Sequence, residues 1–363
     1  MAPSVLAAMG VAGFEARIPL PGNVAGACLL LIDGLGAELL DSYAADAPVL
    51  AGLRGPTLRV GFPSTTAAGL AAVGTGCRSG EHGMVGMSFR LPDVGVINAL
   101  RWRPHPWGED LRDAAVPERV QPRPTVFERA ASTGVAVSVI SGAAFGGSGL
   151  TRAVLRGGRY IGVHALGDLA ATVRAALAEG GFCYGYHADL DLVGHLHGPG
   201  SAAWRMQLRQ VDTLVESIVE GLPSGGLLAV VADHGMVAID EAEAVDIDAT
   251  ESLRDGVDAI GGEVRARHVY TRAGADVLPV WREVLGDRAW VVTREEAIAA
   301  GWFGDRVADD VRLRIGDVVV AARGCSGMLR RAAEPIESSL IGQHGSLTEA
   351  EQRVPLLLAL GAR

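Results

Sequence analysis

Residues 61–76 read G-F-P-S-T-T-A-A-G-L-A-A-V-G-T-G, and this stretch decides how the rest of the chain is interpreted. Two adjacent threonines follow a proline turn and precede a run of Ala, Gly, Leu and Val, which predicts a buried helix whose first turn presents a hydroxyl group. The N-terminus of a helix carries unpaired N–H groups and a positive dipole end, so it favours an alkoxide or a phosphate in front of it. Thr65 or Thr66 is therefore either a helix cap or a nucleophile.

The composition limits the classes of function that the chain can have. Its 363 residues, 49% of them hydrophobic, suffice for one large α/β domain or two smaller ones. A net charge of -10 argues against a protein that binds a nucleic-acid polymer, because such a protein needs a basic surface. A small anionic ligand would have to be held by metal ions or by a local cationic pocket.

The cysteines and the apolar runs indicate the cellular setting. Cys28, Cys77, Cys183 and Cys325 are far apart and form no C-x-x-C pair, so we interpret them as reduced core residues. The sequence shows no signal-peptide pattern and no apolar run of the roughly 18 residues that span a bilayer. We therefore expect a cytoplasmic protein with no membrane partner, and no pattern indicates its oligomeric state.

Two apolar runs predict buried strands that end in candidate ligands. Residues 27–36 read A-C-L-L-L-I-D-G-L-G, with Asp33 at the carboxyl end of the strand. Residues 226–237 read G-L-L-A-V-V-A-D-H-G-M-V and end the strand with Asp233 and His234. In open α/β sheets, ligands bind at the carboxyl ends of the strands, so these residues are candidates for a site. Asp33 taken alone could instead cap the helix that follows it. A buried carboxylate beside an imidazole needs partners such as a metal ion.

Two further segments carry ligand-type residues. Residues 186–201 read Y-H-A-D-L-D-L-V-G-H-L-H-G-P-G-S, in which Asp191 and His195 lie four apart; we expect a loop after a strand, with the composition of a metal site. Near the end of the chain His344 lies in I-G-Q-H-G-S-L, before a last apolar strand. His82, in G-E-H-G-M-V-G, is interpreted as structural because no second histidine is near it.

The composition also suggests how the chain is divided. Between residues 251 and 334 charged and apolar segments alternate and no dense ligand cluster occurs, which predicts an inserted α+β cap. Residues 1–250 and 335–363 then form the catalytic domain. Residues 88–124, rich in Arg, Trp and Pro, are expected to form an irregular excursion over the surface, of the kind that commonly lines sites.

Seven residues supply three carboxylates, three imidazoles and one hydroxyl, mostly at predicted strand ends. They are Asp33, Thr66, Asp191, His195, Asp233, His234 and His344. This set suffices for two metal ions at one active edge.

The order of these motifs resembles the alkaline phosphatase superfamily, and most closely its nucleotide pyrophosphatase/phosphodiesterase-like branch. The shared pattern is a strand-end Asp, a helix-opening Ser or Thr followed nine and ten residues later by T-G, a D-x-x-G-H-x-x-G-P segment, a D-H-G and a final G-x-H-G before V-P-L. Here the T-G is Thr75-Gly76, so the nine-residue step selects Thr66 as the nucleophile. The resemblance implies a three-layer α/β sandwich with a largely parallel central sheet and a small inserted α+β cap.

The resemblance also implies the roles of the seven residues. Asp191, His195 and His344 would bind one zinc ion. Asp33, Asp233, His234 and the Thr66 oxygen would bind the other. Mn²⁺ or another divalent ion is compatible with the same ligands.

One position departs from the family pattern. The phosphodiesterase branch usually has an Asn after the nucleophile helix that donates to a phosphate oxygen, and here the matching position holds Met87. Asn98, Arg101 or a backbone N–H would have to take its place. The candidate substrate contacts are therefore Met87, Asn98, Arg101 and Thr65, which precedes the nucleophile.

We therefore expect a hydrolase that cleaves phosphodiester or pyrophosphate bonds of a small phosphorylated substrate, such as a nucleotide, through a phosphothreonine. Alternatives within the superfamily are a phosphomonoesterase, a phosphonate C–P hydrolase and a metal-dependent mutase. Alkaline phosphatases proper have a third metal site that needs an acid before the nucleophile, and this chain has Thr65 there, which favours diesters. In contrast, Arg90, Arg101 and Arg103 could neutralise the two charges of a monoester. A non-catalytic metal-binding protein is the alternative from another class.

Overall fold

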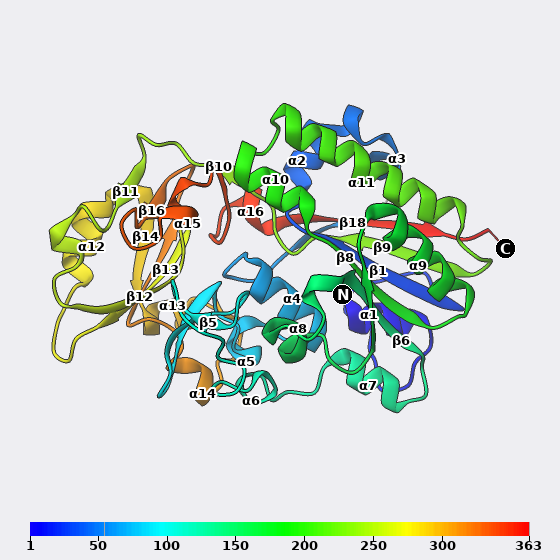
Figure 1. Ribbon diagram of the computed structural model, residues 1–363, viewed down its shortest axis with the longest axis horizontal. Helices are drawn as coiled ribbons and strands as arrows, with labels where there is room; N and C mark the ends of the chain where they lie inside the picture. Colours follow the sequence, from blue (N-terminus) through cyan, green and yellow to red (C-terminus); the bar gives the residue numbers. More distant parts are fainter. Residues whose placement is uncertain (54, 363) are drawn as a thin grey trace.

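A seven-stranded sheet forms the centre of the computed structural model, which describes residues 1–53 and 55–362 (Figure 1). The strands lie in the order β2-β18-β9-β1-β8-β6-β7. Their bounds are β1 Gly26–Ile32, β2 Thr57–Arg59, β6 Val137–Gly142, β7 Arg159–Val163, β8 Phe182–His187, β9 Gly226–Val231 and β18 Arg353–Leu360. β1 pairs in parallel with β8 and β9, and β6 with β7 and β8, whereas β18 runs antiparallel to β9 and β2. The sheet is thus largely parallel, as predicted.

Helices cover both faces of this sheet (Figure 1). One layer contains α2 (Ala37–Ser42), α3 (Pro48–Gly52), α9 (Leu166–Ala178), α10 (Asp189–His197) and α11 (Ala202–Glu220). The opposite layer contains α1 (Ala2–Ala8), α4 (Thr66–Thr75), α7 (Val126–Ser132) and α8 (Gly149–Val154). The arrangement confirms the predicted α/β sandwich.

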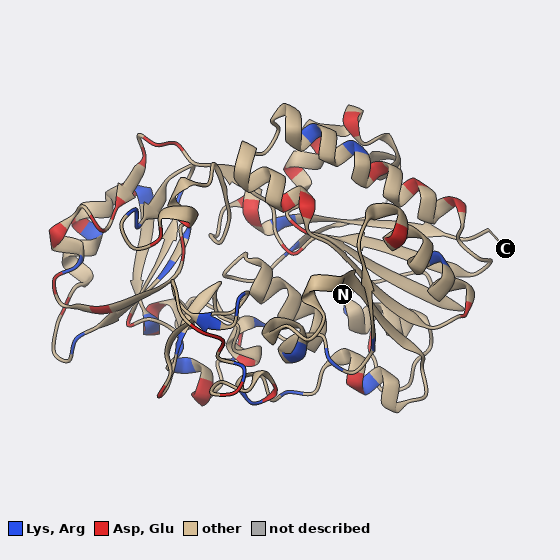
Figure 2. Cartoon of the chain, in the orientation of Figure 1, with Lys and Arg blue, Asp and Glu red and all other residues tan. Residues whose placement is uncertain are grey.

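The central strands are hydrophobic throughout because both faces of the sheet are covered. All residues of β1, β8 and β9 are buried, and Figure 2 shows these strands almost free of charged residues. Parallel strands enclosed by helices have this composition. The carboxyl end of β1 leads to Asp33, and that of β9 leads to Asp233.

A second sheet lies within the segment predicted as an inserted cap. Its four strands follow the order β12-β13-β15-β14 and pair antiparallel. The strands are β12 Val257–Glu263, β13 Ala266–Thr271, β14 Ala289–Thr293 and β15 Val318–Ala322, accompanied by α12 Leu278–Leu285, α13 Arg294–Ala299 and α14 Asp309–Arg312. A separate apolar cluster around the buried Trp281 supports this sheet. The exact bounds of the cap stay a prediction.

Short elements connect these parts. Two-stranded sheets pair β10 (Val237–Ala238) with β17 (Gly342–Gln343) and β11 (Ala244–Asp246) with β16 (Gly327–Leu329). The short helices are α5 Ser79–His82, α6 Pro117–Val120, α15 Pro335–Ser339 and α16 Glu349–Gln352. Within the described residues, no helix has both the length and the apolar character needed to cross a membrane.

Three expectations about local structure were wrong. Residues 88–104 contain a three-stranded antiparallel sheet, β3 Ser88–Leu91, β4 Gly95–Asn98 and β5 Arg103–Pro104, in place of a fully irregular excursion. Trp102 beside it is buried, and its indole N–H donates to the carbonyl of Ala115. The Asp191–His195 segment is helix α10, not a loop. Of the cysteines only Cys28 and Cys183 are core residues, because Cys77 is partly exposed and Cys325 is exposed.

Two buried ion pairs hold strand β13 and the loop before it against neighbouring elements. Arg265 donates to both carboxylate oxygens of Glu351 in α16, at 3.0 and 2.7 Å. Arg267 donates to Glu334 at 2.8 Å, and both side chains are fully buried. Burial raises the pKa of Glu334, but Arg267 and His105 outweigh burial and lower that pKa to about 2.

We predict that Arg267→Met lowers the free energy of unfolding by about 3–5 kcal/mol, because it leaves the Glu334 carboxylate buried without its main cation. The contribution of this pair to the free energy of unfolding is complete at pH values above 4.5, the ordinary pKa of glutamate. It is lost as the pH falls towards 2. Urea unfolding at pH 7 measures the change. Arg312→Met, which removes an exposed pair with Glu295, is the matched control and should cost less than about 1 kcal/mol.

Candidate active site

Helix α4 begins at Thr66 and brings this residue to the carboxyl edge of the central sheet. The Thr66 hydroxyl lies 3.3 Å from Nε2 of His234. Gly69, one turn further on, allows this approach, because a Cβ there would lie 2.4 Å from the Cβ of Asp233. Thr65 occupies the N-cap position, yet its side chain makes no capping bond and donates instead to Glu263 at 2.6 Å. The capping alternative for Thr65 therefore has no support in the structure.

The first ligand group consists of Asp33, Asp233 and His234, which follow the carboxyl ends of β1 and β9. Each offers a ligand atom within 4.8 Å of the others, and all three are buried. Nε2 of His234 lies 3.2 Å from Oδ1 of Asp33 and 3.7 Å from Oδ2 of Asp233. Gly34 makes room for helix α10, because a Cβ there would lie 2.9 Å from Oδ1 of Asp191. Its φ of +73° is also a backbone conformation that favours glycine.

The second ligand group consists of Asp191, His195 and His344. Asp191 and His195 are one turn apart in α10, so both side chains point to the same side of this helix. Nε2 of His195 lies 3.1 Å from Oδ2 of Asp191, and Nε2 of His344 lies 3.8 Å from Oδ1. Asp191 thus stands between the two imidazoles.

The two ligand groups adjoin each other. The rings of His234 and His344 stack with centroids 3.6 Å apart and an angle of 16° between their planes. The structure therefore brings together all six predicted ligands and the Thr66 hydroxyl, from segments that span residues 33–344 of the sequence.

Each histidine of the two groups is oriented for ligation by a backbone carbonyl. Nδ1 of His195 lies 2.7 Å from the oxygen of Gly342, Nδ1 of His344 lies 3.0 Å from that of Ser64, and Nδ1 of His234 lies 3.0 Å from that of Gly235. A carbonyl only accepts, so each Nδ1 carries a proton. Nε2 would then be the nitrogen left to bind an ion, in place of a proton shared with the carboxylates, which is how a metal-binding histidine is held.

The carboxylates have unused ligand capacity. Oδ1 of Asp33, Oδ1 of Asp191 and Oδ2 of Asp233 are buried and have no hydrogen-bond partner among the described residues. Burying an unsatisfied carboxylate oxygen is costly, and a cation removes that cost. The donor set therefore fits two divalent ions with nitrogen and oxygen ligands.

Burial and the closely spaced charges also shift the pKa values of the ligand residues. Burial and the neighbouring Asp33 raise the pKa of Asp233 well above its ordinary value. Burial alone lowers the pKa of His234, but Asp233 and Asp33 outweigh it and raise this pKa to about 10. Burial and the charge on His234 lower the pKa of His344. Two buried carboxylates so close together repel each other until a cation is shared between them.

Sequence reasoning missed two residues at the site. Tyr186 donates its hydroxyl to Oδ2 of Asp33, and the parallel register of β1 and β8, which sets Leu31 beside Tyr186, would have indicated this contact. Glu263, from β12, accepts the Thr65 hydroxyl. No sequence pattern signals it, because it comes from a segment without a ligand cluster.

The four predicted substrate contacts have different surroundings. Thr65 and the backbone N–H of Met87 both donate to Glu263, at 2.6 and 3.3 Å. The side chain of Asn98 instead accepts from the backbone of Leu100 and Arg101 in a turn. Among the described residues, no hydrogen bond or ion pair joins Asn98 or Arg101 to either ligand group.

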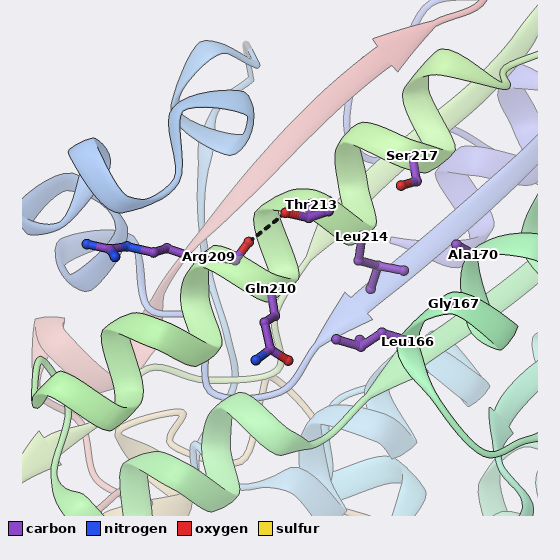
Figure 3. Close-up of a pocket in the computed structure, with 8 residues that line it drawn as sticks. All are labelled: Leu166, Gly167, Ala170, Arg209, Gln210, Thr213, Leu214 and Ser217. Atoms are coloured by element: carbon purple, nitrogen blue, oxygen red, sulfur yellow. Dashed lines mark hydrogen bonds between the residues drawn. The ribbon is translucent and has the colours of Figure 1, made fainter.

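A cavity away from the site lies between α9 and α11 (Figure 3). It has a volume of about 320 Å³, and its charged lining residue, Arg209, pairs with Asp46. The lining residues are Leu166, Gly167, Ala170, Arg209, Gln210, Thr213, Leu214 and Ser217. No member of either ligand group lines it, so it is not the catalytic site.

The family model for type I phosphodiesterase / nucleotide pyrophosphatase matches residues 27–347, a range that includes Thr66 and both ligand groups. The chain belongs to this family. The match confirms the resemblance inferred from the motifs and makes the protein a hydrolase acting on phosphoric ester bonds, of a metal-dependent family. No curated protein matches the chain in sequence.

Several solved structures share the fold of this chain. Murine ectonucleotide pyrophosphatase/phosphodiesterase 5 aligns over 93% of this chain and 88% of its own, with a TM-score of 0.70 and 14% identity. The human counterpart has a TM-score of 0.70 and 16% identity, with 92% and 87% of the two chains covered. Phosphonoacetate hydrolase from Sinorhizobium meliloti 1021, in complex with phosphonoformate, has a TM-score of 0.67 and 18% identity, with 92% and 89% covered.

We predict that the purified protein binds about two divalent transition-metal ions per chain, as a two-metal site requires. Metal analysis by mass spectrometry measures the content. His195→Ala and His234→Ala, one from each ligand group, should each lower it by about one ion. His82→Ala, which alters a buried histidine outside both groups, is the control and should leave the content unchanged. A metal-free wild type after dialysis against zinc would contradict the prediction.

Proposed function

We propose that the protein hydrolyses phosphodiester or pyrophosphate bonds through a covalent intermediate on Thr66, with two zinc ions as cofactors. One observation carries this proposal: the Thr66 hydroxyl opens a helix 3.3 Å from His234, beside two adjoining groups of metal-ligand side chains. A structural threonine would not need six such residues around it.

The two ligand groups would hold one ion each. Asp191, His195 and His344 would bind the first, and the second would be bound by Asp33, Asp233 and His234. When bound, divalent ions lower the pKa of a hydroxyl or water and neutralise phosphoryl oxygens.

The residues of the chain supply the positions for an in-line displacement. The Thr66 hydroxyl loses its proton to solvent, and its oxygen attacks phosphorus while the bond to the leaving oxygen breaks and that oxygen takes up a proton from solvent. Water then attacks the phosphothreonine, which releases the phosphorylated product and restores the hydroxyl. The N-terminus of α4 directs its free N–H groups towards the anionic phosphoryl group during both steps.

The charges near the site support a diester as substrate. Two of the three arginines that could neutralise a monoester dianion have other partners: Arg90 pairs with Asp258 and lies over Tyr270, 4.4 Å from the ring centroid. Arg101 lies over Trp107 at 5.9 Å. A diester carries one negative charge and needs fewer cations than a dianion. The murine relative has also been solved in complex with AMP, as an inactive variant, which suggests a nucleotide substrate for this chain.

Hydrolysis of a phosphonate C–P bond is a second candidate. It is supported by the fold shared with phosphonoacetate hydrolase, which has been solved with phosphonoacetate bound. The same threonine and ligand groups would serve this reaction, and only the group next to phosphorus would differ.

We predict that Thr66→Ala lowers kcat for an aryl phosphodiester by at least about 1,000-fold, because it removes the attacking oxygen. Thr66→Ser keeps a hydroxyl and should retain more activity than Thr66→Ala. Thr65→Ala should be milder as well, since Thr65 contacts Glu263 and not His234. Steady-state kinetics with matched metal content give the ranking, and a larger loss in Thr65→Ala would assign the nucleophile to Thr65.

We also predict that kcat/KM for bis-p-nitrophenyl phosphate exceeds that for p-nitrophenyl phosphate at one pH and one zinc concentration. Phosphonoacetate and a dinucleotide polyphosphate extend the comparison to the other candidate bonds. A monoester preference of more than about tenfold, or about 1.4 kcal/mol in the barrier, would contradict the diesterase assignment but not the role of Thr66.

A further inference from the structure

Glu263 brings a carboxylate from the second sheet to the residue before the nucleophile. It is the last residue of β12, and its side chain is only 6% exposed. Oε2 accepts the Thr65 hydroxyl at 2.6 Å and the Met87 backbone N–H at 3.3 Å. Both donors flank the predicted substrate position, because Thr65 precedes Thr66 and Met87 replaces the family's phosphate-binding Asn.

The other oxygen of Glu263 is buried and free. Oε1 has no hydrogen-bond partner among the described residues. It faces the loop that carries His344, since a Cβ added to Gly345 would lie 3.2 Å from it. Ser64 and Gly345 are themselves paired across this point, so Glu263 lies between the nucleophile helix and the second ligand group.

No cationic side chain of the described residues forms an ion pair with this carboxylate. The two arginines that follow it in sequence are engaged elsewhere, Arg265 with Glu351 and Arg267 with Glu334. Within residues 1–53 and 55–362, no ion pair involves Glu263. Burial raises its pKa to about 7, against the opposing effects of its hydrogen bonds from Thr65 and Met87 and of the more distant charges on His234 and Arg267. Divalent cations bound nearby would favour the charged form.

We propose that Glu263 is a specificity-determining residue, whose buried carboxylate disfavours a transferred phosphoryl group with two negative charges and so selects phosphodiester monoanions over monoester dianions. This inference rests on the proposed function. A unit charge within several ångströms, in a region shielded from water, changes the binding of a second charge strongly. It also disfavours phosphonoacetate, whose carboxylate adds a further negative charge.

Met87 strengthens this discrimination. A methionine side chain donates no hydrogen bond to a phosphate oxygen, and the backbone N–H of Met87 is already directed at Glu263. The site therefore has a negative charge close to the position at which the family usually places a neutral donor. A diester, with an organic substituent in place of one anionic oxygen, avoids this repulsion.

The experiment compares wild type with Glu263→Gln, which keeps the size of the side chain and an oxygen that accepts from Thr65 while it removes the charge. We measure kcat/KM for bis-p-nitrophenyl phosphate and p-nitrophenyl phosphate, and the inhibition constant of inorganic phosphate, at pH 8 with zinc. The monoester-to-diester ratio should rise at least about tenfold, equal to about 1.4 kcal/mol. The inhibition constant of phosphate should fall by a similar factor.

Glu283→Gln is the matched control, because it removes the same charge from an exposed position of the same subdomain. It should leave both the ratio and the inhibition constant within about twofold of wild type. If Glu263→Gln does not fold, as judged by circular dichroism, Glu263→Met carries the test with the same expected direction.

An unchanged ratio in a folded, metal-loaded Glu263 variant would overturn the proposal, as would an equal loss of both activities. These outcomes differ from failure of the proposed function. If metal-loaded wild type hydrolyses neither ester, the phosphoesterase assignment fails, whereas an active wild type with an unchanged ratio in the variant removes only the role of Glu263.

Discussion

The repulsion between three buried carboxylates is the constraint on which the rest of the structure depends. Asp33, Asp191 and Asp233 lie at one edge of the sheet, and each keeps a buried oxygen without a hydrogen-bond partner. Burial and the neighbouring Asp33 raise the pKa of Asp233, and, against the effect of burial, Asp233 and Asp33 raise the pKa of His234. His195 and His234, whose pKa values are raised, compensate part of the charge. Cations shared between the carboxylates would complete the compensation, so metal binding should contribute to stability as well as to chemistry.

This constraint explains several features of the fold around the ligand edge. Gly69 lets α4 approach the β9 end, and Gly34 lets α10 approach the β1 end, so that four segments converge on one edge. The second sheet is tied to this edge by buried ion pairs instead of apolar contacts alone. Arg265, two residues after Glu263, pairs with Glu351 of α16, whose backbone carbonyl accepts from the N–H of Gly235. The same bonds therefore fix both the His234 loop and Glu263.

Local patterns predicted the buried strands and the candidate ligands, since apolar runs end in Asp33 and Asp233. The layered fold and the division of the ligands into two groups, which the structure brings together, were implied by the resemblance to the family that the motifs carry. Helix α10 was missed because its ligand-rich sequence resembles a loop, although the spacing of Asp191 and His195 fits one helical turn. Glu263 could not be found, since its role arises from a contact between residues 65 and 263 with no local signature. Asn98 was a candidate by residue type, yet the structure uses it in a turn.

The fold shared by phosphodiesterases and phosphonoacetate hydrolase does not by itself determine the substrate. Cations held by the two ligand groups, as proposed, would attract any phosphoryl anion. Discrimination then depends on charges that metal ligation does not consume. In this chain Arg90 is engaged by Asp258, whereas Glu263 has no cationic partner among the described residues. The net charge of -10 adds a long-range repulsion that grows with the charge of the substrate. Both effects act in the same direction, so under the proposed function the least negative phosphoryl group would bind at this edge with the smallest electrostatic cost.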